Sequence, residues 1–230
     1  MTLCFGLSVF QLSAQQSKNA SNNKEGSNLA PTRTYKKARA LQSSTAKKMA
    51  KVYEALEAVD EKGEPAPDME LVTSILTELR NNREDLKSYD RSVMWNAWAY
   101  VYFSDGDYDN AMSSYKNLIN EPEVTLGLRI SALLSLGQLH LVKENYKLGI
   151  DYILQWMEEV EKVTAQSWSL LGQAYFQTGE YRKSLSSMEK AINLAEEEGY
   201  KPRENWYVAV SYTHLRAHET LRYLVCRLLL

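Results

Sequence analysis

The sequence repeats one arrangement of small and large side chains three times, in windows of about 36 residues. Three tyrosines mark the same place in each window, 38 and 35 residues apart. A small residue lies nine positions before each tyrosine, a second lies three positions after it, and a bulky residue follows four positions later. The members are Ala99, Tyr108, Ala111 and Tyr115; Gly137, Tyr146, Gly149 and Ile153; and Gly172, Tyr181, Ser184 and Met188. Because the same small and large positions recur in register about every 36 residues, the sequence predicts a stack of similar structural repeats.

Each unit is expected to be a pair of α-helices. In the third window Trp168, Leu171 and Tyr175 are spaced i, i+3 and i+7, so they share one face of a helix. A polar turn follows at 178–180, and the second helix is predicted to begin at the tyrosine. The small residues let the two backbones approach closely, and the bulky residues fill the space beside them. Because one such hairpin cannot bury its apolar face alone, we expect an all-α fold, a right-handed superhelical solenoid of antiparallel helix pairs.

These residues resemble the tetratricopeptide repeat, whose pattern is W-x2-L-G-x2-Y-x8-A-x3-F-x2-A. The third window matches this pattern nearly throughout, from Trp168 to Ala191, with Ser184 and Met188 in place of its alanine and phenylalanine. The first window has Trp95, Trp98, Ala99, Tyr102, Ala111 and Tyr115; the second has Leu133, Leu136, Gly137, His140, Gly149 and Ile153; and a fourth begins with Tyr207, Val210 and Ser211. The resemblance covers about residues 45–211, and it is specific for the fold but not for any one function.

The chain divides by composition and repeat phase into five segments. They are an export signal at 1–14, a disordered linker at 15–43, a degenerate first helix pair at 44–90, repeat units at 91–211, and a tail out of phase with the repeats at 212–230. The units run over about 92–129, 130–164 and 165–203, with a fourth beginning at 204. In the degenerate pair, helices are predicted at 45–60 and 68–82, joined by a turn that holds Pro65 and Pro67.

The first 14 residues predict export. Thr2 to Ala14 is an apolar run that ends in small residues, as in a secretory signal cleaved after Ala14. No Lys or Arg precedes the run, so we expect the charged start to lie upstream. The predicted location is the periplasm, and the alternative is a cytoplasmic protein with an apolar N-terminus. Residues 15–43 bury too little to offset an ordering entropy of about 1–2 kcal/mol per residue, so they are predicted to be a solvated tether, with lipid or peptidoglycan contact as the alternative.

The tail beyond Ser211 loses the repeat phase. His218 and Thr220 stand where a fourth unit would have its turn and its tyrosine. The chain ends in three leucines, whereas a terminal repeat normally presents a polar outer face. The string from Tyr212 resembles a translated sequencing-library adapter that recurs at the ends of proteins predicted from assembled reads. We therefore expect the tail not to be native and further repeats to be lost; a divergent C-terminal helix is the alternative.

Charge and residue usage exclude several functions. The formal net charge is −2 and the basic excess lies in the terminal segments, so the acidic repeat region is unsuited to nucleic acid. Cys4 and Cys226 lie outside the repeats, which therefore have no disulfide and no thiolate nucleophile. His214 and His218 are spaced so that they could share one helix face as metal ligands, but both lie in the tail, so a metal site is not predicted there. The acidic turn that begins at Asp105 lacks the Gly and the Glu that a calcium-binding loop requires, so it is not predicted to bind calcium. Catalytic and phosphate-binding motifs are missing from the sequence, so no enzyme activity, cofactor, metal or integral membrane span is predicted.

The resemblance implies a partner-binding groove on the concave side, lined by positions two, five, nine and twelve of each first helix. Those positions hold Val93, Asn96, Tyr100 and Phe103; Ser131, Leu134, Gln138 and Leu141; and Gln166, Ser169, Gln173 and Phe176. They are amides, hydroxyls and apolar side chains without Lys or Arg, which disfavours a clamp for partner carboxylates and suits an extended segment or a helix of a protein. For Leu134 and Leu141, packing between units is the alternative role. His140, at a ring position, is predicted to be a core or half-buried residue.

The predicted function is a non-catalytic scaffold that binds a protein partner. The order of segments, with Trp95 to Tyr100 and Glu204 to Tyr207, resembles exported proteobacterial proteins encoded beside TonB–ExbB–ExbD systems. That resemblance implies a periplasmic adaptor in TonB-dependent outer-membrane transport. The alternatives are a repeat module in envelope assembly or wall synthesis, and the regulatory domain of an enzyme whose catalytic part is lost.

Overall fold

The computed structural model describes residues 40–59 and 63–228, with side chains described as far as Arg216. The predicted export signal and nearly all of the predicted linker lie outside these residues. The described residues form helices and no strand; Val59 and Pro65 make one isolated β-bridge. The helices are α2 (Ser43–Leu56), α3 (Met69–Asn81), the short 3-10 helix η1 (Arg83–Asp85), α4 (Ser88–Ser104), α5 (Tyr108–Ile119), α6 (Leu126–Val142), α7 (Tyr146–Glu159), α8 (Ala165–Gln177), α9 (Tyr181–Glu197) and α10 (Glu204–Leu228).

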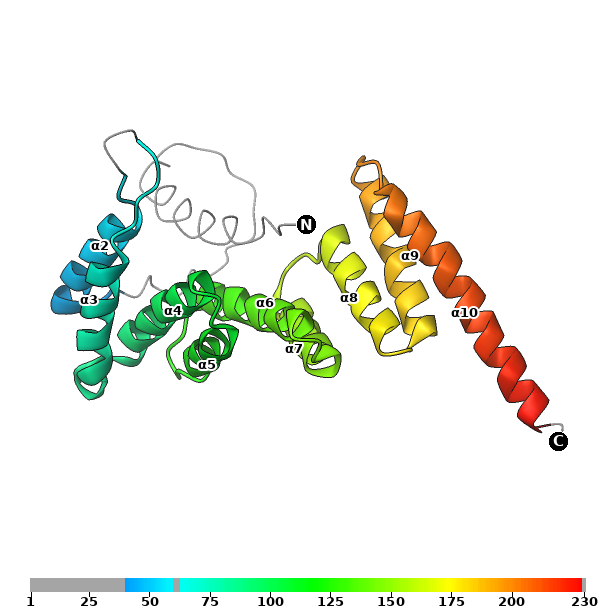
Figure 1. Ribbon diagram of the computed structural model, residues 1–230, viewed down its shortest axis with the longest axis horizontal. Helices are drawn as coiled ribbons and strands as arrows, with labels where there is room; N and C mark the ends of the chain where they lie inside the picture. Colours follow the sequence, from blue (N-terminus) through cyan, green and yellow to red (C-terminus); the bar gives the residue numbers. More distant parts are fainter. Residues whose placement is uncertain (1–39, 60–62, 229–230) are drawn as a thin grey trace, which may run out of the picture. The chain divides into compact units, whose positions relative to one another are not determined.

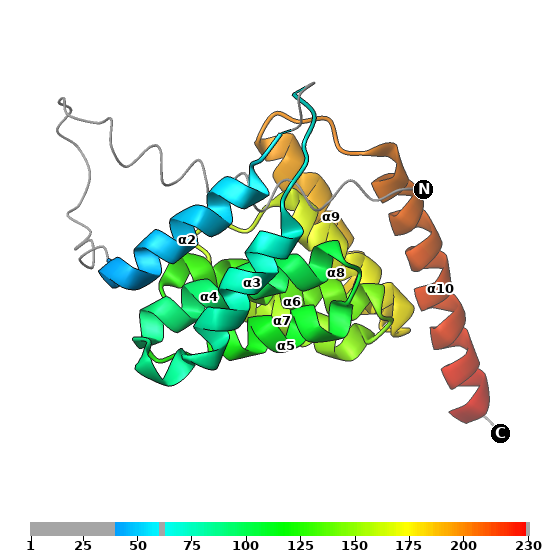
Figure 2. The same cartoon turned by 60° about the vertical axis from the view of Figure 1, so that its left-hand side comes forward.

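Consecutive helices pack as antiparallel pairs, and each pair packs on the next. The pairs are α2 with α3, α4 with α5, α6 with α7, and α8 with α9. The second helix of each pair also contacts the first helix of the following pair, and α4 contacts α6 (Figure 1, Figure 2). The predicted fold, an all-α solenoid of helix pairs, is therefore confirmed. The second helices begin at Tyr108, Tyr146 and Tyr181, as predicted.

The two helices of a pair approach most closely at the predicted small residues. A Cβ atom added to Gly137 would lie 2.7 Å from Cγ1 of Ile153, and one added to Gly149 would lie 2.5 Å from Cδ2 of Leu141. In the third pair, the Ser184 hydroxyl donates a 2.7 Å hydrogen bond across the same interface to the Gly172 carbonyl. These distances leave no room for a larger side chain at the crossing point, which explains why slim and bulky positions recur in register.

The turn inside each pair has one repeated backbone geometry. The backbone N–H three residues beyond the last helical residue donates to the carbonyl of the ring residue five positions earlier, a bond typical of a helix that ends with a left-handed residue. The bonds run from Asp107 to Tyr102 (2.8 Å), from Asn145 to His140 (2.8 Å) and from Glu180 to Tyr175 (2.9 Å). Gly106 and Gly179 take the left-handed position with φ of 76°, but Glu144 takes it in the second pair with φ of 59°. A side chain is strained in that conformation.

The degenerate pair packs on α4 and completes the first hydrophobic core. Met49 and Val52 of α2, Leu76 and Leu79 of α3, and Met94 of α4 are buried together. The predicted helix at 45–60 is shorter than expected because α2 ends at Leu56. The Asp90 carboxylate of α4 is buried and accepts hydrogen bonds from the Gln42 N–H (3.2 Å) and the Thr45 hydroxyl (3.3 Å). An acceptor from α4 thus caps the start of α2, where the side chain of Gln42 makes no cap of its own.

Ion pairs join the beginning of a first helix to the end of its second helix. Arg91 makes a two-point contact with Glu121, with Nε–Oε1 and Nη2–Oε2 distances of 2.8 Å each. This contact raises the pKa of the Arg91 guanidinium. One unit later Arg129 repeats the arrangement with Glu159, at an Nε–Oε1 distance of 2.7 Å. An Arg–Glu ion pair therefore recurs in two successive units, in addition to the repeated apolar contacts.

The last described helix continues through the place of the predicted fourth turn. α10 runs unbroken from Glu204 to Leu228. Trp206 and Thr213 are buried, and Trp206 packs with Ala191, Ile192 and Ala195 of α9. The second half of α10 extends past the start of α9, beyond the turn that joins α8 and α9 (Figure 1, Figure 2). None of the helices in the described residues is long and apolar enough to cross a membrane.

Candidate functional site

The twelve predicted partner-binding residues lie on the first helices α4, α6 and α8. Two of these helices start at a threonine that accepts a hydrogen bond from a backbone N–H of the first turn, Thr125 before α6 and Thr164 before α8. Val93 and Ser169 are buried, Gln166 and Gln173 are exposed, and the other eight residues are half-buried. Whether they bind a partner stays a prediction, but burial leaves Val93 and Ser169 almost no surface to offer one.

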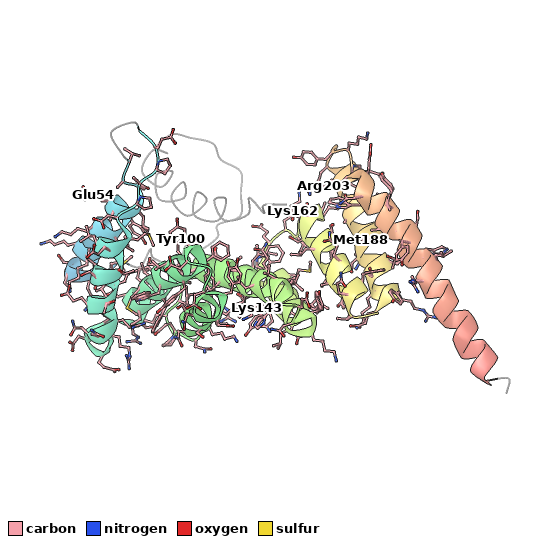
Figure 3. The ribbon with its side chains drawn as sticks, viewed as in Figure 1. Glu54, Tyr100, Lys143, Lys162, Met188 and Arg203 are labelled. Carbon is pink, nitrogen blue, oxygen red and sulfur yellow. The ribbon has the colours of Figure 1, made fainter. Side chains whose placement is uncertain are left out.

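On α4, the four predicted partner-binding residues differ in exposure: the first is buried and the other three are partly accessible. Val93 is 8% exposed because it belongs to the core shared with α2 and α3. Asn96, Tyr100 and Phe103 are half-buried, and Tyr100 is labelled in Figure 3. The ring of Phe103 packs on Tyr108, the first residue of α5, with 5.8 Å between ring centroids.

On α6, one of the two predicted leucines serves packing. Leu141 lies against Gly149 of α7 and packs with the core cluster that includes Leu171 and Tyr175 of α8. Leu141 therefore contributes to the packing of its own helix pair, and its role in partner binding stays a prediction. Leu134, Ser131 and Gln138 are half-buried. An apolar and an amide side chain thus stay partly accessible at the middle of this helix.

On α8, an amide and an aromatic ring lie one turn apart. The Gln173 side-chain amide donates to the Ser169 hydroxyl at 3.3 Å, which orients the exposed glutamine. Phe176 contacts the ring of Tyr181 at 5.4 Å and that of Tyr212 on α10 at 5.6 Å, both between centroids. The aromatic surface therefore continues from α8 onto α9 and α10.

Two rings beside the predicted residues were missed by sequence reasoning. Tyr108 and Tyr181 contact Phe103 and Phe176, so each ring pair forms one surface at the turn end of a first helix. The sequence did contain a signal for these ring pairs: in the first and third units, the phenylalanine at position twelve is followed five residues later by a tyrosine.

The electrostatics of the twelve positions are neutral. None carries a carboxylate, an ammonium or a guanidinium group. Within the described part of the chain, no group of three or more His, Cys, Asp or Glu side chains could hold a metal ion. The arrangement offers hydrogen-bonding amides, hydroxyls and rings, which suits recognition of a polypeptide rather than acid–base chemistry.

His140 is a core residue, as predicted. Its ring is 4% exposed and stacks on Tyr152 of α7, with 5.4 Å between centroids and 8° between planes. Neither ring nitrogen has a hydrogen-bond partner among the described residues. Burial, with a smaller effect from the nearby Lys116 ammonium, lowers the pKa of His140, so the ring is held neutral in the folded chain.

Comparison with known proteins supports the same fold. The tetratricopeptide repeat family model matches residues 92–121 and 165–198, which carry the first and third windows. No curated protein matches this sequence.

Three solved structures illustrate the likeness. A crystal structure of MamA protein is 17% identical, covers 79% of this chain and 88% of its own, and gives a TM-score of 0.55. MamA from residue 41 to its end, from Desulfovibrio magneticus RS-1, is 17% identical and covers 83% of this chain and 96% of its own, with a TM-score of 0.54. The apo form of RapI is 13% identical and covers 79% of this chain and 65% of its own, with a TM-score of 0.54. At these identities the likeness shows the fold alone.

Proposed function

We propose that this chain is a non-catalytic scaffold that binds a segment of a partner protein along α4, α6 and α8. Tetratricopeptide repeats are typically interaction modules, and the family model matches two of the units. The observation that carries the proposal is the row of uncharged, accessible side chains at equivalent positions of successive first helices. It runs from Asn96 and Tyr100 through Gln138 to Gln173 and Phe176.

The chemistry of the row indicates what the partner segment must offer. The amides of Asn96, Gln138 and Gln173 can each donate to and accept from a peptide backbone, so they suit an extended segment whose own backbone groups are unpaired. The rings of Tyr100 and Phe176 add apolar contact area at a small cost in side-chain entropy. Because no cation lines the row, the segment is expected to be neutral and apolar rather than acidic.

Alanine substitution in cells tests this proposal. Tyr100→Ala and Gln173→Ala remove an inward ring and an inward amide, while Tyr200→Ala and Gln155→Ala remove the same groups at exposed sites away from the row. After in-cell crosslinking, each inward variant is expected to lower partner yield, with about a tenfold loss of affinity for the tyrosine. The outward variants are expected to match the wild type. If both inward variants keep every partner at wild-type yield, the row is not the binding site.

We further propose that the protein is exported and acts in the periplasm as an adaptor of TonB-dependent transport. The support comes from the sequence alone, namely the apolar run that ends at Ala14 and the resemblance to exported proteins encoded beside TonB–ExbB–ExbD systems. Cell fractionation with intact-mass measurement should find a mature chain beginning at Gln15 in the periplasmic fraction. An uncleaved chain in the cytoplasmic fraction would contradict export.

The identity of the captured partner decides between the functions. Crosslinks to components of a TonB–ExbB–ExbD complex or its receptors support the transport adaptor. Crosslinks to wall-synthesis enzymes or to outer-membrane insertion machinery contradict it and assign the module to envelope assembly.

A further inference from the structure

His140 is a buried titratable side chain for which the fold supplies no hydrogen-bond acceptor. Its ring is 4% exposed, and neither Nδ1 nor Nε2 has a partner among the described residues. A neutral imidazole has one N–H donor and one acceptor nitrogen, whereas the protonated ring has two donors. Because a buried donor without an acceptor and a buried charge without a counter-ion both destabilise a fold, the packed state disfavours protonation of this ring.

The first and third units carry a tyrosine at the position of His140. The backbone carbonyls of Tyr102 and Tyr175 accept the same turn bond that the His140 carbonyl accepts. A phenol ordinarily stays neutral between pH 5 and 8, whereas histidine ordinarily gains a proton within that range. The packing of a unit therefore does not require a titrating ring at this position, and the second unit has one.

His140 lies where α6 packs between α5 of the first unit and α7 of its own unit. Its ring stacks on Tyr152 of α7, with 5.4 Å between centroids and 8° between planes. The contact between α5 and α6, here termed the unit junction, buries apolar side chains from both helices, namely Ala111, Met112, Leu136 and Leu139. Tyr152 also packs against this cluster, so the His140 ring is part of the contact between two successive units.

The groups around the ring act differently on its protonated form. On the α5 side, the Lys116 ammonium repels a second positive charge, and burial together with this ammonium lowers the pKa of His140. On the α7 side, the face of the Tyr152 ring attracts a cation but cannot accept the N–H bonds, which lie in the plane of the imidazole. The other phenols near the unit junction, Tyr115 of α5 and Tyr102 of α4, already hydrogen-bond to other side chains.

We propose that His140 is a pH-sensitive switch whose protonation opens the unit junction between α5 and α6. In the open state, water accepts both N–H bonds and solvates the charge, so acid favours that state. The α5 side opens because Lys116 repels the protonated ring there, while the stack on Tyr152 favours contact with α7. The pairing of α6 with α7 persists, since the close contacts at Gly137 and Gly149 hold it and contain no titrating group.

The unit junction lies between two parts of the proposed binding row. Asn96 and Tyr100 belong to α4 of the first unit, and Gln138 belongs to α6 of the second. Opening changes the spacing between these side chains, so acid is expected to weaken a partner segment that contacts both units. This consequence rests on the proposed function, whereas the opening itself does not. A measurement on the chain without a partner therefore tests the switch alone.

Amide hydrogen exchange of the full chain at pH 7.5 and 5.5, corrected for the intrinsic pH dependence of exchange, measures this opening. Helices that lose packing exchange faster. With a pKa of about 6.5 for the hydrated ring and a lower value for the buried ring, opening can increase at most about tenfold between these pH values. The increase is expected in α5 and α6 and not in α8 and α9.

Three variants of the full chain identify the group that titrates. His140→Phe is expected to abolish the increase, and Lys116→Gln to reduce it, because the protonated ring is then less strongly repelled in the packed state. Tyr175→Phe, at the equivalent position of the third unit, is expected to keep the wild-type increase.

The proposal is overturned if exchange in α5 and α6 rises equally in wild type and His140→Phe, or if α8 and α9 respond as strongly, which would indicate global unfolding. If His140→Phe does not fold, the Lys116→Gln variant decides, and an undiminished increase in that variant contradicts the switch.

Discussion

Glycine and other small residues determine how closely the helices of a pair can lie. At Gly149 a methyl group would approach two side-chain atoms of Leu141, at 2.5 and 2.9 Å, and the Gly137 carbonyl oxygen at 3.1 Å. A backbone oxygen cannot move aside as a flexible side chain can. The crossing points therefore tolerate less change than the large residues around them, and glycine is required there for space rather than for backbone freedom.

Gly149→Ala is expected to destabilise the chain by about 1–3 kcal/mol, because the added methyl group overpacks the crossing of α6 and α7. Gly127→Ala is the matched control: it lies on α6 with nothing within 4 Å of an added Cβ, so better helix propensity should stabilise the chain by about 0.5–1 kcal/mol. Urea denaturation of both variants checks the sign of each change. A stabilising effect of Gly149→Ala would show that the helices are not in close contact.

Glu144→Gly is expected to stabilise the chain by about 0.5–1 kcal/mol, since the left-handed conformation strains a side chain and not a glycine. Gly106→Ala, at the equivalent turn position, should have the opposite sign because it introduces the same strain. Thermal denaturation measures both variants. Two shifts of the same sign would contradict a shared turn geometry.

His140 makes stability depend on pH. The folded chain holds the ring neutral, whereas the unfolded chain takes up a proton near the ordinary pKa of about 6.5. The unfolded state therefore binds more protons as the pH falls below that value, so the free energy of unfolding decreases by at most about 1.4 kcal/mol per pH unit until the lower folded pKa is reached.

His140→Phe should flatten this dependence below about pH 6.5. Denaturation at a series of pH values from 7.5 to 4.5 measures the difference in the free energy of unfolding between the variant and the wild type. Parallel curves for wild type and His140→Phe would exclude a neutral buried imidazole.

At the scale of the elements, the repeat phase located the start of α5, α7 and α9, because a tyrosine opens each of these second helices. The ion pairs between Arg91 and Glu121 and between Arg129 and Glu159 were not predicted. Their partners stand 30 residues apart, and the repeat pattern consists of tyrosines and of small and large side chains, without charged positions. An Arg four residues before the first large position of the first two units, Arg91 before Trp95 and Arg129 before Leu133, was the signal that could have revealed them.

The helices that carry the twelve candidate residues were predicted from the sequence, but the exposure of those residues was not. The unit register gave the correct helices for all twelve residues, since position along a helix follows from the pattern. The burial of Val93 could not be predicted, because it depends on how the degenerate pair packs on α4. That pair lacks the small and large residues that define the register elsewhere.

The docking of α2 on the first unit depends on one buried carboxylate. Asp90→Ala removes the acceptor for the Gln42 N–H and the Thr45 hydroxyl, so it is expected to cost about 1–2 kcal/mol. Asp90→Asn keeps an oxygen acceptor and should cost less. Hydrogen exchange should quicken within α2 for the alanine variant and remain slow in α8. Unchanged exchange in α2 would show that Asp90 does not cap that helix.

At the scale of the whole molecule, the described residues combine stacked helix pairs with an uncharged row on three successive first helices. Repeated pairs place the row at regular intervals, so one polypeptide segment can contact several units at once. We propose that the row on α4, α6 and α8, and not the outward surface of the second helices, contacts the partner.

A photo-crosslinking amino acid placed at either of two matched glutamines distinguishes these two surfaces. Position 138 lies in the row on α6, and position 155 is exposed on α7 of the same pair. Crosslinked peptides, identified by mass spectrometry, are expected to place one neutral partner segment at position 138 and to be absent at position 155. Equal yields of the same segment at both positions, or capture at 155 alone, would contradict the account.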